Sequence, residues 1–107
     1  MKQIATHFEG LFLFEPTVHA DARGYFMESF RASFFEDLGL KFIQDNEARS
    51  TYGVIRGLHY QEPPYAQTKL LRVLEGRILD VTVDLRAASK TFGKAYVVEL
   101  SAENKLQ

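Results

Sequence analysis

One short segment combines the residue types that could abstract a proton and stabilise the charge that forms. His59 lies in the sequence Arg56-Gly57-Leu58-His59, and Lys69 follows ten residues later. A neutral imidazole can remove a proton near pH 7, and an ammonium group beside a developing oxyanion stabilises that oxyanion. The same two residues also have a purely structural explanation. His59 could be a hydrogen-bonded histidine with no catalytic role. Lys69 could extend from a strand end so that its ammonium group reaches water.

Other polar residues could bind a ligand. Arg23 and Arg56 each precede a glycine, which lets a ligand approach the backbone, and a guanidinium can bind phosphate with two parallel hydrogen bonds. For an arginine picked at random, however, a surface salt bridge is the better explanation. Glu28, Gln44 and Asn46 could hydrogen-bond sugar hydroxyls or a base, but such residues also populate ordinary polar loops.

Composition narrows the class of protein. The 107 residues suit one domain spanning 1–107, and the net charge of −1 gives no field that would collect nucleic acid or an acidic membrane. The absence of cysteine excludes disulfides, and the start has no signal-peptide pattern, so we expect a cytoplasmic protein. His7, His19 and His59 are widely spaced and form no cluster of ligands, so we expect no metal site.

The elements that must position these residues are mostly strands. Ser33 and Glu36 have the spacing of a helix capping box, and Gly39 follows at a position typical of a helix end, which predicts one short helix. Three runs alternate apolar and polar residues or are rich in β-formers: Lys69–Glu75, Arg77–Arg86 and Ala95–Leu100. In the second run, Leu79 and Val81 share an apolar face, and Asp84 lies on the other. Strands with turns between them predict an all-β sandwich or barrel. A barrel that stopped at Gln107 would leave an open edge, so either a second chain closes it or sequence is missing.

Taken together, the motifs resemble one family, the dTDP-4-dehydrorhamnose 3,5-epimerases, from about residue 10 to the end of the chain. The motifs are Asp21-x-Arg23-Gly24-x-Phe26-x-Glu28, Gln44-x-Asn46, Arg56-Gly57-x-His59-x-Gln61, Gln67-x-Lys69-Leu70 and Ser89-x-x-Phe92-Gly93. The compound motif around His59, with lysine ten residues after the histidine, is the most specific of them. The resemblance implies the N-terminal portion of a cupin-type jelly roll, all-β with one short helix, metal-free and without cofactor. It also implies a homodimer that exchanges its N-terminal strands.

The resemblance further implies an isomerase that inverts carbons 3 and 5 of a dTDP-4-keto-6-deoxyhexose in dTDP-rhamnose-type biosynthesis. His59 would be the base, and Lys69 would lie at the keto oxygen. The substrate-binding residues would be Arg23, Glu28, Gln44, Asn46, Arg56, His59 and Lys69. The family's tyrosine acid lies beyond the segment that matches, and His19 stands where the family has an aromatic residue on the thymine. A nucleotide-sugar-binding module without catalysis and a related sugar ketoisomerase are the alternatives.

Overall fold

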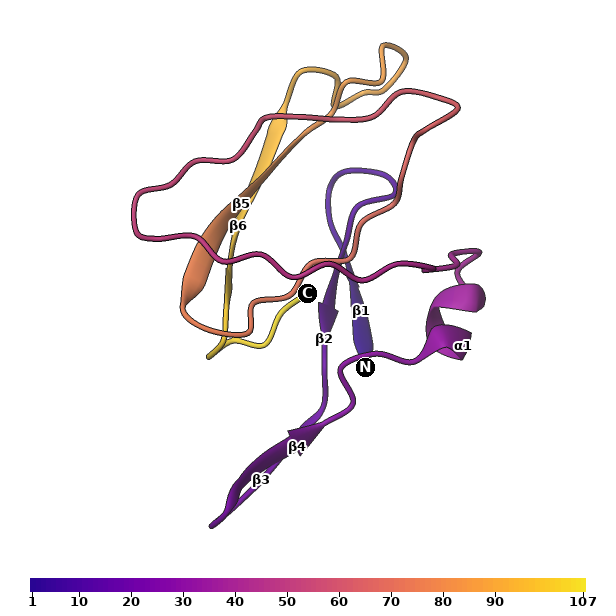
Figure 1. The fold of residues 1–107 in the computed structure, drawn as a ribbon. Coiled ribbons are helices and arrows are strands. Elements are labelled where there is room, and N and C mark those ends of the chain that lie inside the picture. The colour runs from indigo at the N-terminus through magenta and orange to yellow at the C-terminus, as the bar shows by residue number, and fades with distance from the viewer. The chain divides into compact units, whose positions relative to one another are not determined.

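The computed structural model describes residues 1–107 and contains six strands and one short helix. The chain divides into two compact units, which we describe separately. Unit 1 combines Met1–Ser29 with Leu70–Gln107, and unit 2 is Phe30–Lys69. All strands belong to unit 1 and the helix belongs to unit 2 (Figure 1). No helix of the structure is long and apolar enough to cross a membrane.

Unit 1 is built from three antiparallel hairpins (Figure 1). Their strands are β1 (Lys2–Ala5) with β2 (Phe12–Glu15), β3 (Val18–Asp21) with β4 (Gly24–Met27), and β5 (Arg77–Val83) with β6 (Ala95–Ser101). The sequence pattern predicts none of the first four strands, because a run of four residues is too short to show a clear alternation. It does predict β5 and β6, where seven-residue strands pair in register along their whole length.

The end of the chain is tied to the first hairpin. Phe14 and Gln107 exchange both backbone hydrogen bonds, 2.8 and 3.0 Å long, as directly opposed residues of an antiparallel pair do. The side-chain amide of Gln107 also donates to the carbonyl of Ser29 at 3.0 Å. Phe8, Phe14 and Leu100 are the buried apolar residues of this unit. Backbone pairing, together with this small core, therefore holds sequence-distant segments of unit 1 together.

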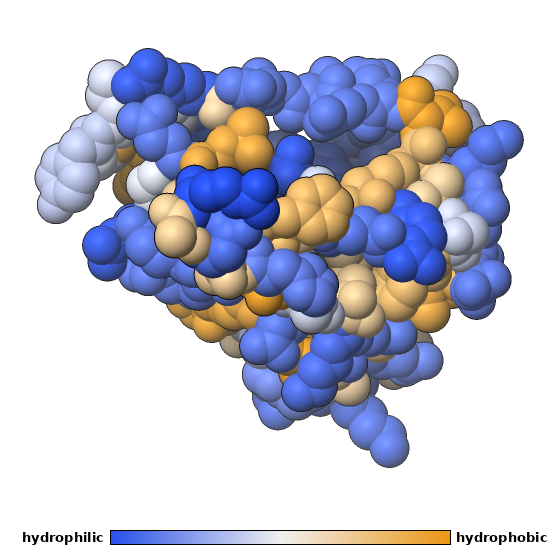
Figure 2. Space-filling view, turned by 90° about the horizontal axis from the view of Figure 1, so that it is seen from below, coloured by the Kyte–Doolittle hydropathy of each residue, from blue (hydrophilic) through white to orange (hydrophobic).

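The apolar residues of β5 are largely uncovered. Leu79 and Val81 alternate onto one face as predicted, and Leu79 is 68% exposed while Val81 is also exposed. Asp84, directly after the strand on the other face, is buried because Arg86, Ser89 and Thr91 all donate hydrogen bonds to its carboxylate. Figure 2 accordingly shows apolar side chains, in orange, among polar ones at the surface.

One of the three strand predictions is wrong. Lys69–Glu75 forms no strand, although its residues alternate as expected. A strand persists only where a neighbouring backbone accepts and donates the ladder hydrogen bonds. No other segment of the chain pairs with these residues. Alternation of apolar and polar residues therefore shows that a segment is suited to a sheet, but it does not show which segment would pair with it.

Unit 2 has an aromatic core around its helix, α1 (Ala32–Glu36). Phe35 is fully buried, and its ring lies 5.2–5.3 Å from the rings of Phe30, Phe34 and Phe42, measured between centroids. Such edge-on and offset ring pairs each contribute about 0.5–1.5 kcal/mol beyond their burial. This cluster explains how a helix of only five residues persists.

The predicted helix exists, but its predicted cap is wrong. The N-cap residue is Arg31, in extended conformation, and no side chain caps the helix. Ser33 lies inside the first turn instead, since residues three apart are also neighbours within a helix and the spacing to Glu36 fits both positions. Gly39 follows the helix with φ of 75°, the left-handed conformation predicted for it, and donates to Glu36 O at 2.8 Å.

Candidate functional site

The residues predicted to form the site are divided between the two units. Unit 1 holds Arg23 and Glu28, and unit 2 holds Gln44, Asn46, Arg56, His59 and Lys69. All seven are exposed to solvent. The structure therefore groups five of the seven in one compact unit of the chain, and the geometry of that group can be followed residue by residue.

Arg56 is held by two neighbours in its own loop. Its Nε donates to Oγ of Ser50 at 2.9 Å, and its Nη2 donates to the backbone carbonyl of Arg49 at 3.0 Å. The expectation for a random arginine was a surface salt bridge, but both acceptors here are neutral. Neither Ser50 nor Arg49 lies in a motif that would mark it as a partner of Arg56. The only sequence signal is a hydroxyl six residues before the arginine, which is too common to be informative.

Gly57 is required by the position of His59. The glycine has φ of 107°, in a region that other residues rarely adopt. A Cβ at this position would lie 3.1 Å from Nδ1 of His59 and 3.3 Å from its backbone nitrogen. The Arg-Gly-x-His motif thus has a steric reason. The imidazole itself is exposed and makes no hydrogen bond within the chain.

Two amides of the predicted binding set contact each other. Nε2 of Gln44 donates to Oδ1 of Asn46 at 3.0 Å. Because each side chain is fixed by the other, the carbonyl of Gln44 stays available to a ligand as an acceptor, and the amino group of Asn46 stays available as a donor group. Lys69 is exposed at the end of unit 2, and the strand predicted to begin at this residue does not form.

The tyrosine next to His59 has an altered titration. The Tyr60 hydroxyl donates to Oε1 of Glu62 at 3.1 Å. This hydrogen bond, and after it the negative charge of the carboxylate, raises the pKa of Tyr60. The phenol therefore stays protonated over a wider pH range than an isolated tyrosine. Its hydrogen bond to Glu62 engages the only proton it could donate.

Arg23 lies in the turn between β3 and β4, where it forms an ion pair. Its Nη2 lies 2.6 Å from Oδ2 of Asp21, and its Nε lies 3.1 Å from the same oxygen. The bond to the guanidinium lowers the pKa of Asp21 and raises the pKa of Arg23. Both side chains are exposed, so the pair contributes little to stability. Its effect is to orient Arg23 through Nε and Nη2, which both donate to Asp21.

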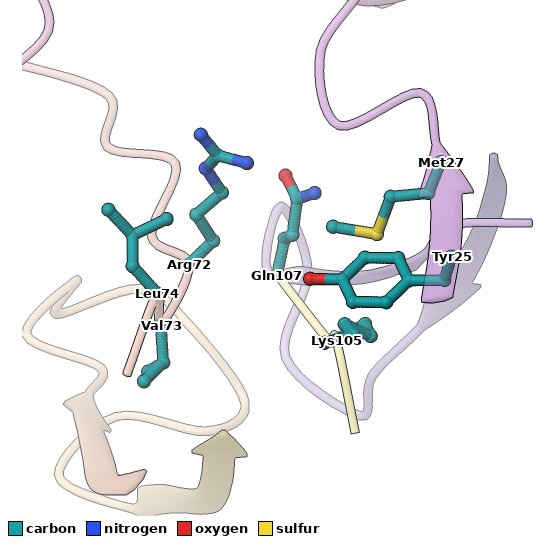
Figure 3. Close-up of a pocket in the computed structure, with 7 residues that line it drawn as sticks. All are labelled: Tyr25, Met27, Arg72, Val73, Leu74, Lys105 and Gln107. Carbon is teal, nitrogen blue, oxygen red and sulfur yellow. The ribbon is translucent and has the colours of Figure 1, made fainter. Parts of the chain in front are cut away.

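The cavity in unit 1 contains none of the predicted residues. It measures about 60 Å³. It is lined by Tyr25, Met27, Arg72, Val73, Leu74, Lys105 and Gln107 (Figure 3). Pockets for drug-sized ligands measure roughly 300–1,000 Å³, so this cavity suits one or two water molecules instead. Oε1 of Gln107, one of the lining residues, is buried and accepts no hydrogen bond from the protein.

The chemistry that unit 2 offers is therefore proton transfer and anion binding. His59 supplies a base, Lys69 supplies a cation, and Arg56 supplies directed N–H donors. No group of three or more His, Asp or Glu side chains that could hold a metal ion occurs in residues 1–107.

Comparisons with known proteins point to one family. The family model described as dTDP-4-dehydrorhamnose 3,5-epimerase matches residues 5–107. A dTDP-4-dehydrorhamnose 3,5-epimerase from Shigella flexneri is 54% identical, over all of this chain and 61% of that protein. The crystal structure of the enzyme of the same name from Elizabethkingia anophelis NUHP1 is 55% identical with a TM-score of 0.90, over all of this chain and 60% of that one.

A third relative carries a ligand. The structure of a dTDP-6-deoxy-D-glucose-3,5-epimerase from Legionella pneumophila Philadelphia 1 in complex with dTDP-4-keto-L-rhamnose is 48% identical. Its TM-score is 0.90, over 99% of this chain and 57% of that one. The chain thus spans about 60% of the length of the relatives it matches. Over that span it has their all-β, cupin-type jelly-roll fold with one short helix. The chain belongs to the dTDP-4-dehydrorhamnose 3,5-epimerase family.

Proposed function

We propose that this protein inverts carbons 3 and 5 of a dTDP-4-keto-6-deoxyhexose by removing protons beside the ketone, in dTDP-rhamnose-type biosynthesis. The observation that carries the proposal is the family match over residues 5–107, which includes the Arg56-Gly57-x-His59 motif and Lys69. The dTDP-4-keto-L-rhamnose bound to the Legionella relative supports the substrate class. The cytoplasmic location stays a prediction.

The proposed chemistry assigns each residue type a task. His59 takes the proton from a carbon next to the ketone, and the charge moves to the keto oxygen as an enolate. Lys69 stabilises that oxyanion electrostatically. Inversion then requires a proton to return on the opposite face of the sugar, so a second group must act as the acid. Arg23 and Arg56 bind the pyrophosphate, and Glu28, Gln44 and Asn46 hydrogen-bond the nucleotide and sugar.

Proton NMR in deuterated water tests this function. With the purified protein and dTDP-4-keto-6-deoxyglucose, we expect the signals of the protons at carbons 3 and 5 to disappear as deuterium enters. Incorporation at one carbon only would restrict the reaction to that carbon. Binding of dTDP without any deuterium incorporation would contradict the proposed catalysis and favour a nucleotide-sugar-binding module.

We also propose that the protein acts as a homodimer in which the β3–β4 hairpin reaches the second copy. The hairpin projects from the end of β2, and all but one of its strand residues are exposed, including Phe26 at 73% (Figure 1). An isolated two-stranded hairpin is marginally stable in water. A second copy that covers its apolar residues would stabilise it and would bring Arg23, in the turn, to the partner's site.

Light scattering after size-exclusion chromatography measures this assembly. We expect a dimer for the unsubstituted protein and a shift toward monomer for Phe26→Asp, because a carboxylate at that position resists burial. Tyr65→Asp is the matched control, since Tyr65 is 75% exposed in unit 2, outside the hairpin, and should leave the dimer intact. A monomeric unsubstituted protein at micromolar concentration would contradict the proposal.

A further inference from the structure

The hydrogen bonds of Arg56 leave a defined set of donors for a ligand. A guanidinium carries five N–H groups in one plane. Ser50 accepts the N–H of Nε, and the carbonyl of Arg49 accepts one of the two N–H groups of Nη2. Three N–H groups of Arg56 are therefore left for a ligand. Both protein acceptors use the edge formed by Nε and Nη2. The edge formed by Nη1 and Nη2 therefore stays available, and this edge can grip two oxygens of a phosphate at once.

From this geometry we propose that Ser50 is a positioning residue that aims Arg56 at the pyrophosphate of the substrate. The inference rests on the proposed function, since it deepens the role of Arg56 in binding a nucleotide diphosphate. Ser50 acts through Arg56 and does not touch the ligand. Its hydroxyl oxygen accepts the Nε hydrogen bond at 2.9 Å and so fixes the rotation of the guanidinium plane.

The benefit of this arrangement is that the arginine is ordered before the ligand arrives. Arg56 and Ser50 are both exposed, and an exposed arginine samples many rotamers. Binding a ligand normally includes the cost of freezing that motion, and a side chain held in place beforehand avoids part of the cost. The second anchor is the backbone carbonyl of Arg49, which side-chain substitution cannot remove. Ser50 is therefore the anchor that mutagenesis can test.

The test compares binding of dTDP and of thymidine by isothermal titration calorimetry. Ser50→Ala should weaken dTDP binding about threefold to tenfold, the effect of losing one hydrogen bond. Thymidine has no phosphate, so its affinity should not change. Ser50→Thr keeps the hydroxyl and should bind dTDP like the unsubstituted protein, which also shows that the site tolerates substitution. In an Arg56→Ala background, Ser50→Ala should cause no further loss, because the two residues act as one unit.

Three results would overturn the inference. Equal dTDP affinity for Ser50→Ala and the unsubstituted protein, with Arg56→Ala weakened, would remove Ser50 from the site and leave the proposed function standing. The same loss from Ser50→Ala with and without Arg56 would mean that the hydroxyl binds phosphate directly. Failure of the unsubstituted protein to bind dTDP would overturn both this inference and the proposed function.

Discussion

His59→Asn is expected to slow deuterium incorporation beside the ketone by a factor of about 10²–10⁴ while leaving dTDP affinity unchanged. Asparagine is polar and close in shape to the near half of the imidazole, but its amide cannot accept a proton near neutral pH. The side chain is exposed and makes no hydrogen bond within the chain, so its replacement should not disturb the fold. Single-turnover rates from proton NMR and a calorimetric titration with dTDP measure the two quantities separately.

The other histidines supply the control. His7 lies in unit 1, where its ring packs against Phe8 at 4.7 Å and Tyr96 at 5.4 Å between centroids, and it has no place in the proposed chemistry. His7→Asn should therefore leave the exchange rate unchanged. His59→Ala should regain part of its exchange when free imidazole is added, because a small base can enter the vacated space. Undiminished exchange in His59→Asn would assign the proton abstraction to another group.

Sequence patterns predict an element well where its partner is close along the chain. β5 and β6 flank a single loop, so alternation and the glycines at positions 76 and 93 were enough to locate both strands. Lys69–Glu75 also alternates but forms no strand, because no other segment of the chain pairs with it. The sequence pattern of a segment does not reveal whether such a partner exists. The four-residue strands of the first two hairpins are the opposite case, since pairing stabilises runs too short to show a pattern.

The site divides in a similar way. Motif spacing singles out His59, Lys69 and Arg56, whose roles stay predictions, and the steric demand at Gly57 gives a reason for the glycine in the motif. The partner of Arg56 escaped prediction, because a serine six residues away becomes a neighbour only through the path of the loop. The ion pair between Arg23 and Asp21 was not predicted either, although both residues lie at the tight turn between β3 and β4.

Asp84 is the clearest example of a residue whose role depends on tertiary structure. The sequence pattern places Asp84 on the face opposite Leu79 and Val81 and does not indicate its burial, yet its side chain is only 2% exposed. Arg86 donates from Nε and Nη2, at 2.9 Å each, and the hydroxyls of Ser89 and Thr91 donate at 2.6 and 2.7 Å. The carboxylate thus collects four side-chain hydrogen bonds and organises the connection between β5 and β6.

Because Asp84 accepts so many hydrogen bonds in the folded state, Asp84→Asn is expected to destabilise the protein at neutral pH. An asparagine amide keeps the volume, but it loses the charge that pairs with Arg86. Its amino group would also face donors. We expect the melting temperature to fall by about 5 °C or more at pH 7, measured by circular dichroism. Asp80→Asn is the matched control, since Asp80 lies on β5, four residues before Asp84, and its carboxylate makes no hydrogen bond.

The pH dependence of this difference has a definite sign. Hydrogen bonds from Arg86, and then from Ser89 and Thr91, hold the pKa of Asp84 far below its ordinary value of 3.8. A carboxylate with a lowered folded-state pKa contributes its full stability above the ordinary value and loses that contribution as the pH falls below it. Urea midpoints of the unsubstituted protein and Asp84→Asn should therefore differ most at pH 5–8, and the difference should shrink progressively as the pH falls below 3.8. A difference that widened in acid would contradict the ionised state of the buried carboxylate, and equal midpoints at pH 7 would show that the cluster orders the loop without stabilising the fold.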